Sequence, residues 1–407
     1  PTAHRTAAHA AHPPPPVTRP LPESINHLLA TPLQALTDLP SFDTSAMDGY
    51  AVSGPGPWHL TPGTGVLAGE TTTRPLEDGT ALPIATGARI PPGATAVVRS
   101  EHAVLQAGGT RLVATRDTRT GQDIRPRAQE CRSGAELLPA GAEVTPAVLG
   151  LAAAAGYDEL RVIPRPRVEI LILGQELLHR GLPRDGLIRD ALGPMLAPWL
   201  HALGADAFVT RRLGDDAEAL HEAVATSTAQ LLVTTGGTAA GPVDHVHATL
   251  RRVHADLLVD GVQVRPGHPM LLARLPTGAH LAGLPGNPLA AVTGLLTLVE
   301  PLLRTLRGAP PRPQRTALLT TDVTGHPADT RVVPVVRAGA APNRAAPDRT
   351  APDRTAQDQP PITPLHFTGP AMLRGLATAH ALAVIPPGGA RTGDPVPVLP
   401  LPWAPTP

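Results

Sequence analysis

VEILIL, residues 168–173, is the clearest indication of the fold in this sequence. It is nearly continuous apolar sequence, and Glu169 is its one charged residue. A strand buried on both faces, as in a parallel sheet covered by helices, has an apolar run of this kind. Comparable runs lie at 207–210, 230–234 and 280–284. The sequence therefore predicts four buried strands in this half of the chain.

Helical patterns lie between and after these strands, at about 191–203, 217–227, 244–254 and 288–306. Strand–helix alternation is typical of an α/β domain in which helices cover both faces of a sheet. We predict a doubly wound, mostly parallel sheet in a domain that spans residues 166–309.

The sequence before this domain lacks the alternation of long apolar runs and helical patterns. Short β segments between Gly and Pro turns, such as 95–98 and 110–113, predict a β-rich domain at 43–124. Flanking pieces at 1–42 and 125–165 predict a helical or linker domain. Within it, residues 23–36 have helical spacing interrupted at Pro32, and the proline-rich residues 9–16 are expected to be frayed.

One helix in the linker domain has clear end signals. Thr145 and Pro146 suit the N-cap and the first helical position, and Gly156 suits the C-terminal end. After residue 310 the helical patterns stop and short β-like runs resume, which predicts a C-terminal, barrel-like β domain at 310–407. Its low-complexity insert, 338–360, repeats Ala-Pro-Asp-Arg-Thr and is expected to be a disordered surface loop.

Composition excludes several function classes. The chain has 407 residues, 42% hydrophobic and 17% charged, which fits a soluble globular protein of several domains. Zero formal net charge predicts no nucleic-acid or membrane partner, and we expect no apolar run long enough to span a bilayer. The single cysteine, Cys131, and the lack of a secretion signal favour the cytoplasm. The chain contains no lysine.

The ends of the predicted strands carry the residues suited to chemistry. Ligands of open parallel sheets bind beyond the carboxyl ends of the strands. Glycines there let backbone N–H groups approach phosphates, and carboxylates can hold Mg²⁺. The four ends read Gly174-Gln175-Glu176, Gly214-Asp215-Asp216, Thr235-Gly236-Gly237-Thr238 with Asp244 nearby, and Pro285-Gly286-Asn287-Pro288.

Each strand end also has a purely structural interpretation. Asn287 and Pro288 suit a helix start, and Glu176 or Asp215 could answer a helix dipole. Their occurrence together at one sheet edge favours a shared ligand site. The histidines do not indicate zinc, because His245 and His247 are two apart on a predicted helix and face different directions.

A second candidate segment is SFDTSAMDGYAV at residues 41–52. Acids, hydroxyls and a glycine cluster there just before a predicted strand. An Asx or hydroxyl turn would use the same residues, so this segment alone does not separate function from turn formation.

Six motifs taken in order resemble the MoeA-type molybdopterin molybdenumtransferases, relatives of the C-terminal domain of gephyrin. They are DTSAMDGYAV (43–52), ATGARIPPGATAVV (85–98), GQEL (174–177), TGGTAAGPVD (235–244), RPGHP (265–269) and GLPGNP (283–288). The resemblance implies a homodimer of four-domain subunits that inserts molybdate into the dithiolene of adenylylated molybdopterin, with Mg²⁺-dependent release of AMP. It also implies a molybdopterin adenylyltransferase as a possible partner.

The resemblance also implies roles for individual residues. Asp48, Thr86 and Glu130 would serve catalysis from the N-terminal half, with Asp48 and Thr86 reaching the site from the β-rich domain of the same or the partner subunit. Glu176, Asp215 and Asp244 would position metal and water, and Arg265 would clamp an anion. The phosphates would be held by Gly236, Gly237 and the segment Pro285, Gly286, Asn287 and Pro288.

The chain departs from the family pattern at several of these places. Glu130 stands for an aspartate, Gln175 for an acid and Gly261 for a lysine; further departures are at Ala191, Leu192, Ala239, Pro242, His268 and Pro370. These departures leave two alternatives open. One is a paralogue that binds molybdopterin as a scaffold without turnover, and the other is a molybdopterin adenylyltransferase.

Overall fold

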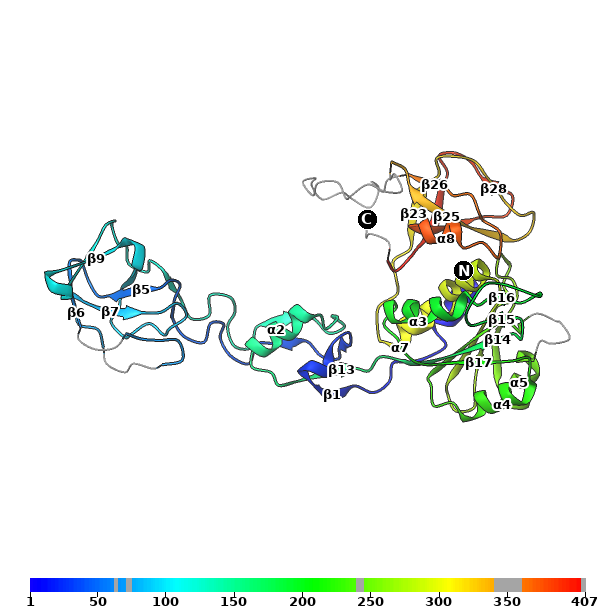
Figure 1. Ribbon diagram of the computed structural model, residues 1–407, viewed down its shortest axis with the longest axis horizontal. Coiled ribbons are helices and arrows are strands. Elements are labelled where there is room, and N and C mark those ends of the chain that lie inside the picture. The colour runs from blue at the N-terminus through cyan, green and yellow to red at the C-terminus, as the bar shows by residue number, and fades with distance from the viewer. Residues whose placement is uncertain (62–64, 71–74, 239–244, 340–360, 404–407) are drawn as a thin grey trace. The chain divides into compact units, whose positions relative to one another are not determined.

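The computed structural model describes residues 1–61, 65–70, 75–238, 245–339 and 361–403. The chain forms two compact units (Figure 1). The first comprises residues 1–17, 26–28 and 163–407, and the second comprises 18–25 and 29–162. The four domain boundaries expected from the sequence stay predictions.

The first unit is built on a six-stranded sheet in the order β17-β14-β18-β22-β21-β19. The strands are β14 (Arg167–Leu173), β17 (Asp206–Leu213), β18 (Leu231–Thr235), β19 (Asp256–Asp260), β21 (Leu271–Arg274) and β22 (His280–Leu284). The first four in spatial order are parallel, and β21 pairs antiparallel with both β22 and β19. The mostly parallel sheet predicted from the apolar runs is confirmed. The strands β21 and β19, which extend the sheet through antiparallel pairing, were not predicted.

Helices cover both faces of this sheet. Alternate residues of β14 point to opposite faces, and the residues on both faces are apolar enough to need burial. Ile170 and Ile172 pack in one apolar cluster with α3 (Leu192–Ala202) and the helical segment at 288–306. Leu171 and Leu173 pack in a second cluster with α4 (Ala217–Thr226) and α5 (Val246–Arg252). Figure 1 shows these helices above and below the sheet.

The longest helical segment runs through α6 (Pro288–Gly294), the π-helix η4 (Leu295–Val299) and α7 (Glu300–Leu306). By length and composition this 19-residue segment could cross a membrane, so the expectation that no run is long enough was wrong. Its most apolar window is 83% buried inside the unit, as in the core helix of a globular domain.

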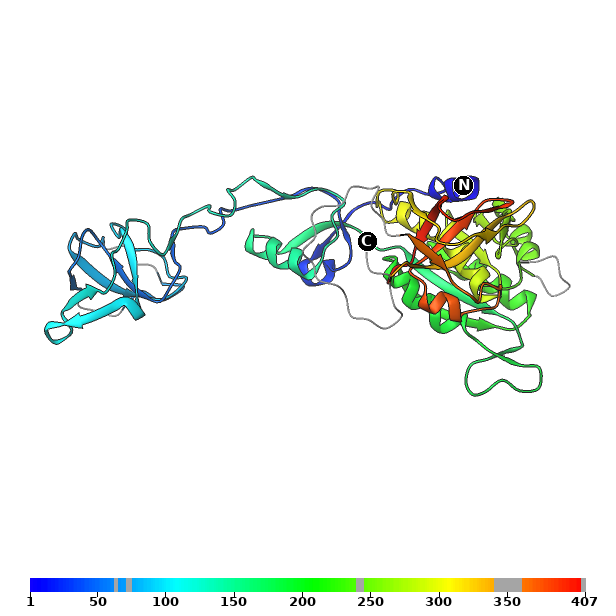
Figure 2. The same cartoon turned by 90° about the horizontal axis from the view of Figure 1, so that it is seen from above.

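Residues 2–11 are packed, so the expectation of a frayed segment at 9–16 was wrong for Ala10 and Ala11, whereas most of residues 12–16 are exposed and form no helix or strand. Helix α1 (Thr2–Ala8), which was not predicted, packs against η4 and α7 (Figure 2). Ala7 and Ala11 are buried in the same cluster as those helices. The buried His280 ring holds the arm through its Nε2, 3.1 Å from the Ala10 carbonyl oxygen.

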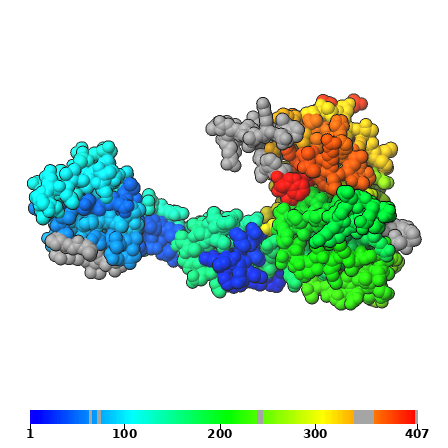
Figure 3. Space-filling view, in the orientation of Figure 1, coloured from blue at the N-terminus to red at the C-terminus, as the bar shows by residue number. Residues whose placement is uncertain are grey.

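The C-terminal region adds a sheet in the order β20-β25-β27-β29-β23, with β26 on β25. Its strands are β20 (Val264–Arg265), β23 (Arg315–Leu318), β25 (Thr330–Arg337), β26 (Ile362–Pro364), β27 (Ala381–Ile385) and β29 (Pro395–Pro400), and β24 (Val323–Thr324) pairs β28 (Gly389–Ala390). Because β20 belongs to the α/β sequence, its pairing joins the two regions, which lie together in Figure 3. The short helix α8 (Arg374–Thr378) was not predicted, and most of the insert, 340–360, lies outside the described residues.

The second unit contains a six-stranded sheet in the order β8-β5-β7-β6-β10-β9. These strands are β5 (Gly49–Val52), β6 (Trp58–Leu60), β7 (Thr80–Ile84), β8 (Ala96–Arg99), β9 (Ala103–Gln106) and β10 (Arg111–Ala114). The helix α2 (Pro146–Ala154) begins as predicted, because the Thr145 hydroxyl accepts a hydrogen bond from the Val148 N–H. Gly156 follows its end with φ 102°.

The expected helix at 23–36 was wrong. That segment forms a 3₁₀ turn (Leu21–Ser24) and the strands β2 (Leu28–Leu29) and β3 (Leu33–Gln34). Leu28 and Leu29 are both buried where β2 pairs in the sheet β1-β13-β2, so strand pairing wins over the helical spacing. The remaining strands are β1 (Val17–Pro20), β4 (Thr44–Ser45), β11 (Ile124–Arg125), β12 (Glu136–Leu138) and β13 (Glu159–Ile163) in this part, and β15 (Leu177–Leu178) and β16 (Ile188–Arg189) in the first unit.

Candidate functional site

The four parallel strands end at one edge of the sheet of the first unit. In spatial order their last residues are Leu213, Leu173, Thr235 and Leu284. Because neighbouring strands are parallel and hydrogen-bonded, the loops that follow them share this edge. Glu176, Asp215, Gly236, Gly237 and Asn287 all lie within three residues of a strand end. The prediction that these loops share an edge is confirmed.

The loops after β14 and β17 contact each other. The Gln175 N–H donates to Asp215 Oδ2 over 3.4 Å. Glu176 is exposed, and its carboxylate folds back so that a Cβ built on Gly174 would lie 2.6 Å from Glu176 Oε2. Only glycine, here at φ 124°, leaves room for that position of the carboxylate. The two loops that carry Glu176 and Asp215 therefore lie side by side.

The loops after β18 and β22 also lie side by side. The Gly236 N–H donates to the Leu284 carbonyl over 2.8 Å, and a Cβ built on Gly286 would lie 3.7 Å from Gly236 Cα. Gly236 and Gly237 have φ values of 78° and 65°, in the left-handed region that favours glycine. The backbones at Gly236 and Gly286 therefore lie close together. Backbone without side chains is the surface that a phosphate group needs for N–H contacts.

The start of α6 differs from the sequence-based interpretation. Asn287 occupies the N-cap position and Pro288 is within the first turn, but the Asn287 side chain makes no capping hydrogen bond. Instead the N–H groups of Leu289 and Ala290 donate to the Pro370 carbonyl oxygen, over 2.9 and 3.4 Å. A loop of the C-terminal region therefore satisfies the donors that we expected to meet phosphate. A backbone carbonyl leaves no side-chain signature, so sequence reasoning could not find it.

Arg265, the predicted anion clamp, already has a carboxylate partner. Its Nε donates to Asp329 Oδ2 over 2.8 Å, and this bond holds the pKa of Asp329 below its ordinary value. The Arg265 side chain is 55% exposed, whereas that of Asp329 is 12% exposed. His326 lies on the other side, with its Nδ1 3.5 Å from Asp329 Oδ2. Nothing in the six motifs pointed to Asp329, which is 64 residues from Arg265.

Asp48 and Thr86 contact each other in the second unit, although 38 residues separate them. The Thr86 N–H donates to Asp48 Oδ1 over 2.7 Å. This bond, with a second one from the Thr86 hydroxyl, lowers the pKa of Asp48, so the carboxylate stays ionised at neutral pH. Both side chains belong to exposed residues. The two motifs thus form one local acidic site.

The structure says less about the roles of the remaining predicted residues, Glu130 and Asp244. Glu130 is exposed in the second unit, and its N–H donates to the Leu39 carbonyl over 2.9 Å. Asp244 falls at 239–244, outside the described residues. Among the residues that the structure describes, no three His, Cys, Asp or Glu side chains gather as a metal site. The metal role of Glu176, Asp215 and Asp244 stays a prediction.

Fold and site together define a doubly wound α/β protein with an anion-suited edge of glycine and carboxylate loops, joined to further β regions. Comparison with known proteins makes the class specific. The chain belongs to the MoeA family of molybdopterin molybdenumtransferases.

Three family models match in order. Residues 2–156 match the MoeA N-terminal region (domains I and II), residues 169–305 match a probable molybdopterin binding domain, and residues 316–401 match the MoeA C-terminal region (domain IV). Together the three models account for most of the chain.

Two relatives span most of the chain. Molybdopterin molybdenumtransferase 2 of Mycobacterium tuberculosis is 37% identical over 329 residues, 76% of this chain and 80% of the relative. Molybdopterin molybdenumtransferase of Staphylococcus aureus is 31% identical over 306 residues, 72% of each chain. The crystal structure of the MoeA protein from Pyrococcus horikoshii superposes with a TM-score of 0.73 at 23% identity, over 98% of each chain. That likeness supports the fold.

Proposed function

We propose that this protein is a transferase that inserts molybdenum from molybdate into adenylylated molybdopterin and releases AMP. Membership of the molybdenumtransferase family supports this assignment. The observation that carries it in the structure is the convergence of four glycine and carboxylate loops at one sheet edge.

The chemistry suits such a site. Two sulfur–molybdenum bonds form while one molybdate oxygen leaves as water with both thiol protons, and a second water splits the phosphoanhydride to give AMP. Molybdate and the pyrophosphate are both anions, so their approach requires oriented N–H donors and cations. The Gly236–Gly237 and Gly286 backbones would hold the phosphates, and Arg265 would contribute positive charge. Glu176 and Asp215 would orient water toward the phosphoanhydride.

Magnesium is compatible with this donor set. Mg²⁺ is usually held by one or two carboxylates together with substrate phosphates rather than by an all-protein cage. Glu176 and Asp215 lie on contacting loops and supply such oxygens, and Asp244 is a further candidate. Bound there, the ion would neutralise charge on the phosphates.

The wider setting is also part of the proposal. A homodimer would let Asp48 and Thr86 of the β-rich domain complete a site at a sheet edge. Adenylylated molybdopterin requires a preceding adenylyl transfer, so a molybdopterin adenylyltransferase is the partner we propose. We place the protein in the cytoplasm, because its one cysteine cannot form an internal disulfide.

The test is AMP release by the purified protein with adenylylated molybdopterin, molybdate and Mg²⁺. Asp48→Ala and Glu176→Ala should each abolish release while the circular dichroism spectrum is unchanged. Asp256→Ala is the matched control, because Asp256 is an exposed acid on β19 paired with Arg274. Full turnover by either variant would remove the proposed role of that residue.

A scaffold that binds molybdopterin without turnover is the second candidate. Two observations favour it: Gln175 stands where the family pattern has an acid, and the Pro370 carbonyl occupies donors at the start of α6. Tight pterin binding with no AMP would select it. ATP-dependent adenylylation would instead select the adenylyltransferase, which the matches to the N- and C-terminal MoeA regions disfavour.

A further inference from the structure

The segment that carries Asp48 is held on two sides by other parts of the chain. On one side, the Ala46 N–H donates to the Asp123 carbonyl over 2.8 Å, and Ser45 pairs with Ile124. On the other, the Ser100 N–H donates to the Asp48 carbonyl over 3.0 Å, and Gly49 pairs with Arg99. The position of Asp48 therefore depends on how far apart these two sides are.

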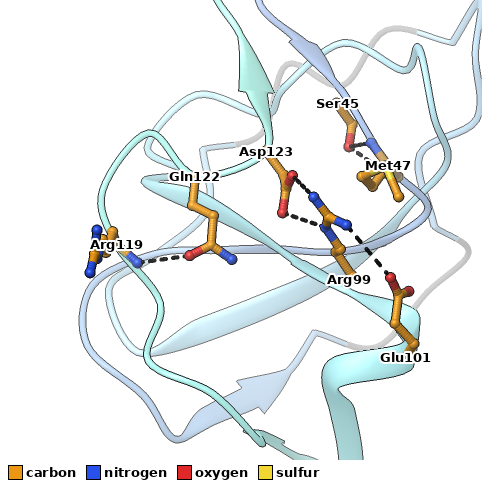
Figure 4. Close-up of polar contacts among 7 residues, drawn as sticks. All are labelled: Ser45, Met47, Arg99, Glu101, Arg119, Gln122 and Asp123. Atoms are coloured by element: carbon orange, nitrogen blue, oxygen red, sulfur yellow. Dashed lines mark hydrogen bonds and ion pairs between the residues drawn. The ribbon is translucent and has the colours of Figure 1, made fainter.

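One ion pair links the two sides directly (Figure 4). The Arg99 guanidinium forms a two-pronged contact with the Asp123 carboxylate, with Nε–Oδ2 at 3.0 Å and Nη2–Oδ1 at 2.9 Å. The Asp123 side chain is 11% exposed and that of Arg99 is 38% exposed. Two parallel bonds fix orientation as well as distance, which a single charge contact does not. Glu101 touches the same guanidinium from solvent at 3.9 Å, with one contact only.

The segment is also bonded to the stretch that carries Thr86, where the Gly87 N–H donates to the Ser45 carbonyl over 2.8 Å and the Ser45 N–H donates to the Ala88 carbonyl over 2.9 Å. Asp123 has φ 55°, a left-handed conformation that is unusual for a residue other than glycine, so its side-chain bonds help to stabilise an unfavourable backbone. The Ser45 hydroxyl donates to the Met47 carbonyl over 2.6 Å and closes the turn that leads to Asp48. Gly49 is pressed against β8, since a built Cβ would lie 2.1 Å from the Val98 carbonyl oxygen. Asp48 thus follows a turn in which Ala46 is bonded to the Asp123 backbone.

We propose that Arg99 and Asp123 are positioning residues for molybdenum transfer, which set the Asp48 carboxylate against Thr86. This inference rests on the proposed function, because it takes Asp48 to act in the reaction. The Asp48–Thr86 bond of 2.7 Å is the contact that the pair maintains. Misplacement of a reacting group by about 1 Å can lower a rate by about 100-fold, so a remote ion pair can control turnover.

The experiment is a double-mutant cycle of Arg99→Gln and Asp123→Asn in the full-length protein, with AMP release as the activity. Each single variant should lower kcat about 10- to 100-fold with KM changed less than about twofold, as expected for loss of positioning. The double variant should be no worse than either single variant, because both remove the same link. Arg99→Lys should not restore kcat, since lysine lacks the planar fork. Glu101→Gln should behave like wild type.

Hydrogen exchange of the peptide spanning residues 43–50 gives a readout that does not depend on activity. It should exchange faster in Arg99→Gln and Asp123→Asn but not in Glu101→Gln, at an unchanged melting temperature. Unchanged exchange, or additive losses of kcat in the double variant, would overturn the positioning role.

The two hypotheses fail in different ways. If Asp48→Asn loses turnover while Arg99→Gln keeps it, the inference is wrong and the proposed function stands. If the wild-type protein releases no AMP, the proposed function fails, and the exchange rates alone decide whether Arg99 and Asp123 hold the segment.

Discussion

Replacing Arg211 with methionine should destabilise the first unit by leaving a buried carboxylate without its cation. Glu169 lies within the apolar strand β14, and its side chain is 4% exposed. Arg211 Nε donates to Glu169 Oε1 over 2.5 Å, and the Ser227 hydroxyl donates to Oε2 over 2.5 Å. After the substitution, Ser227 is the one partner that this carboxylate keeps among the residues that the structure describes.

The expected magnitude follows from burial. Breaking a fully buried pair costs about 3–5 kcal/mol. The Arg211 side chain is 38% exposed, so solvent already screens part of the interaction, and we expect about 2 kcal/mol instead. For a unit of this size the loss corresponds to a fall in melting temperature of about 4–8 °C. Adding Glu169→Gln should regain stability, because it removes the unpaired charge and keeps an acceptor for Ser227.

Differential scanning calorimetry of wild type, Arg211→Met and the double variant tests this account. Arg252→Gln is the matched control: Arg252 also meets a glutamate, Glu218, at 2.5 Å, but both side chains are more than half exposed. It should leave the melting temperature unchanged. If Arg252→Gln destabilised the protein as much as Arg211→Met, or if Glu169→Gln made the loss worse, burial would not be the cause.

Three further predictions concern the buried His280, the Gly236–Gly237 loop and the Arg265–Asp329 pair. Burial lowers the pKa of His280 below its ordinary 6.5, so the stability contributed by the neutral ring is present above that pH and lost as the pH falls through the folded-state pKa. Between about pH 7.5 and about pH 5, the melting temperature should therefore fall less steeply for His280→Gln than for wild type, and equal slopes would contradict this. Gly237→Ala should weaken adenylylated pterin binding about tenfold in calorimetric titrations, since Gly237 has φ 65° and a built Cβ lies 3.1 Å from Leu173 Cδ1; unchanged affinity would exclude the glycine loop from the site. Arg265→Gln should weaken molybdate binding whereas Asp329→Asn should strengthen it, because Asp329 partly neutralises Arg265; shifts of the same sign would disprove a charge effect.

The sheet of the first unit was predictable because burial on both faces leaves a pattern in the sequence. The strand at 280–284 was predicted at its observed bounds, and the apolar run at 168–173 lies within β14. Since parallel strands share an edge, the residues that follow them could be grouped before any coordinates were known. The contacts between Gly236 and Gly286 and between Gln175 and Asp215 fit that grouping.

The features that sequence reasoning missed depend on tertiary contacts. Leu28 and Leu29 fit a helical spacing but pair as a strand, and α1 is a short helix stabilised by packing on η4 and α7. The Pro370 carbonyl that meets α6 is backbone, which any residue could supply. Arg99 and Asp123 are 24 residues apart, and neither lies within one of the six motifs. Their pairing could be recognised only from the fold around the Asp48 segment.

Whether these loops carry out molybdenum transfer can be tested by the stoichiometry of one reaction, with AMP and pterin-bound molybdenum measured in the same sample. A molybdenumtransferase that uses this edge should form the two products in equal amounts, and both should disappear in Glu176→Ala. AMP without bound molybdenum, or equal yields in wild type and Glu176→Ala, would contradict the assignment of transfer to these loops.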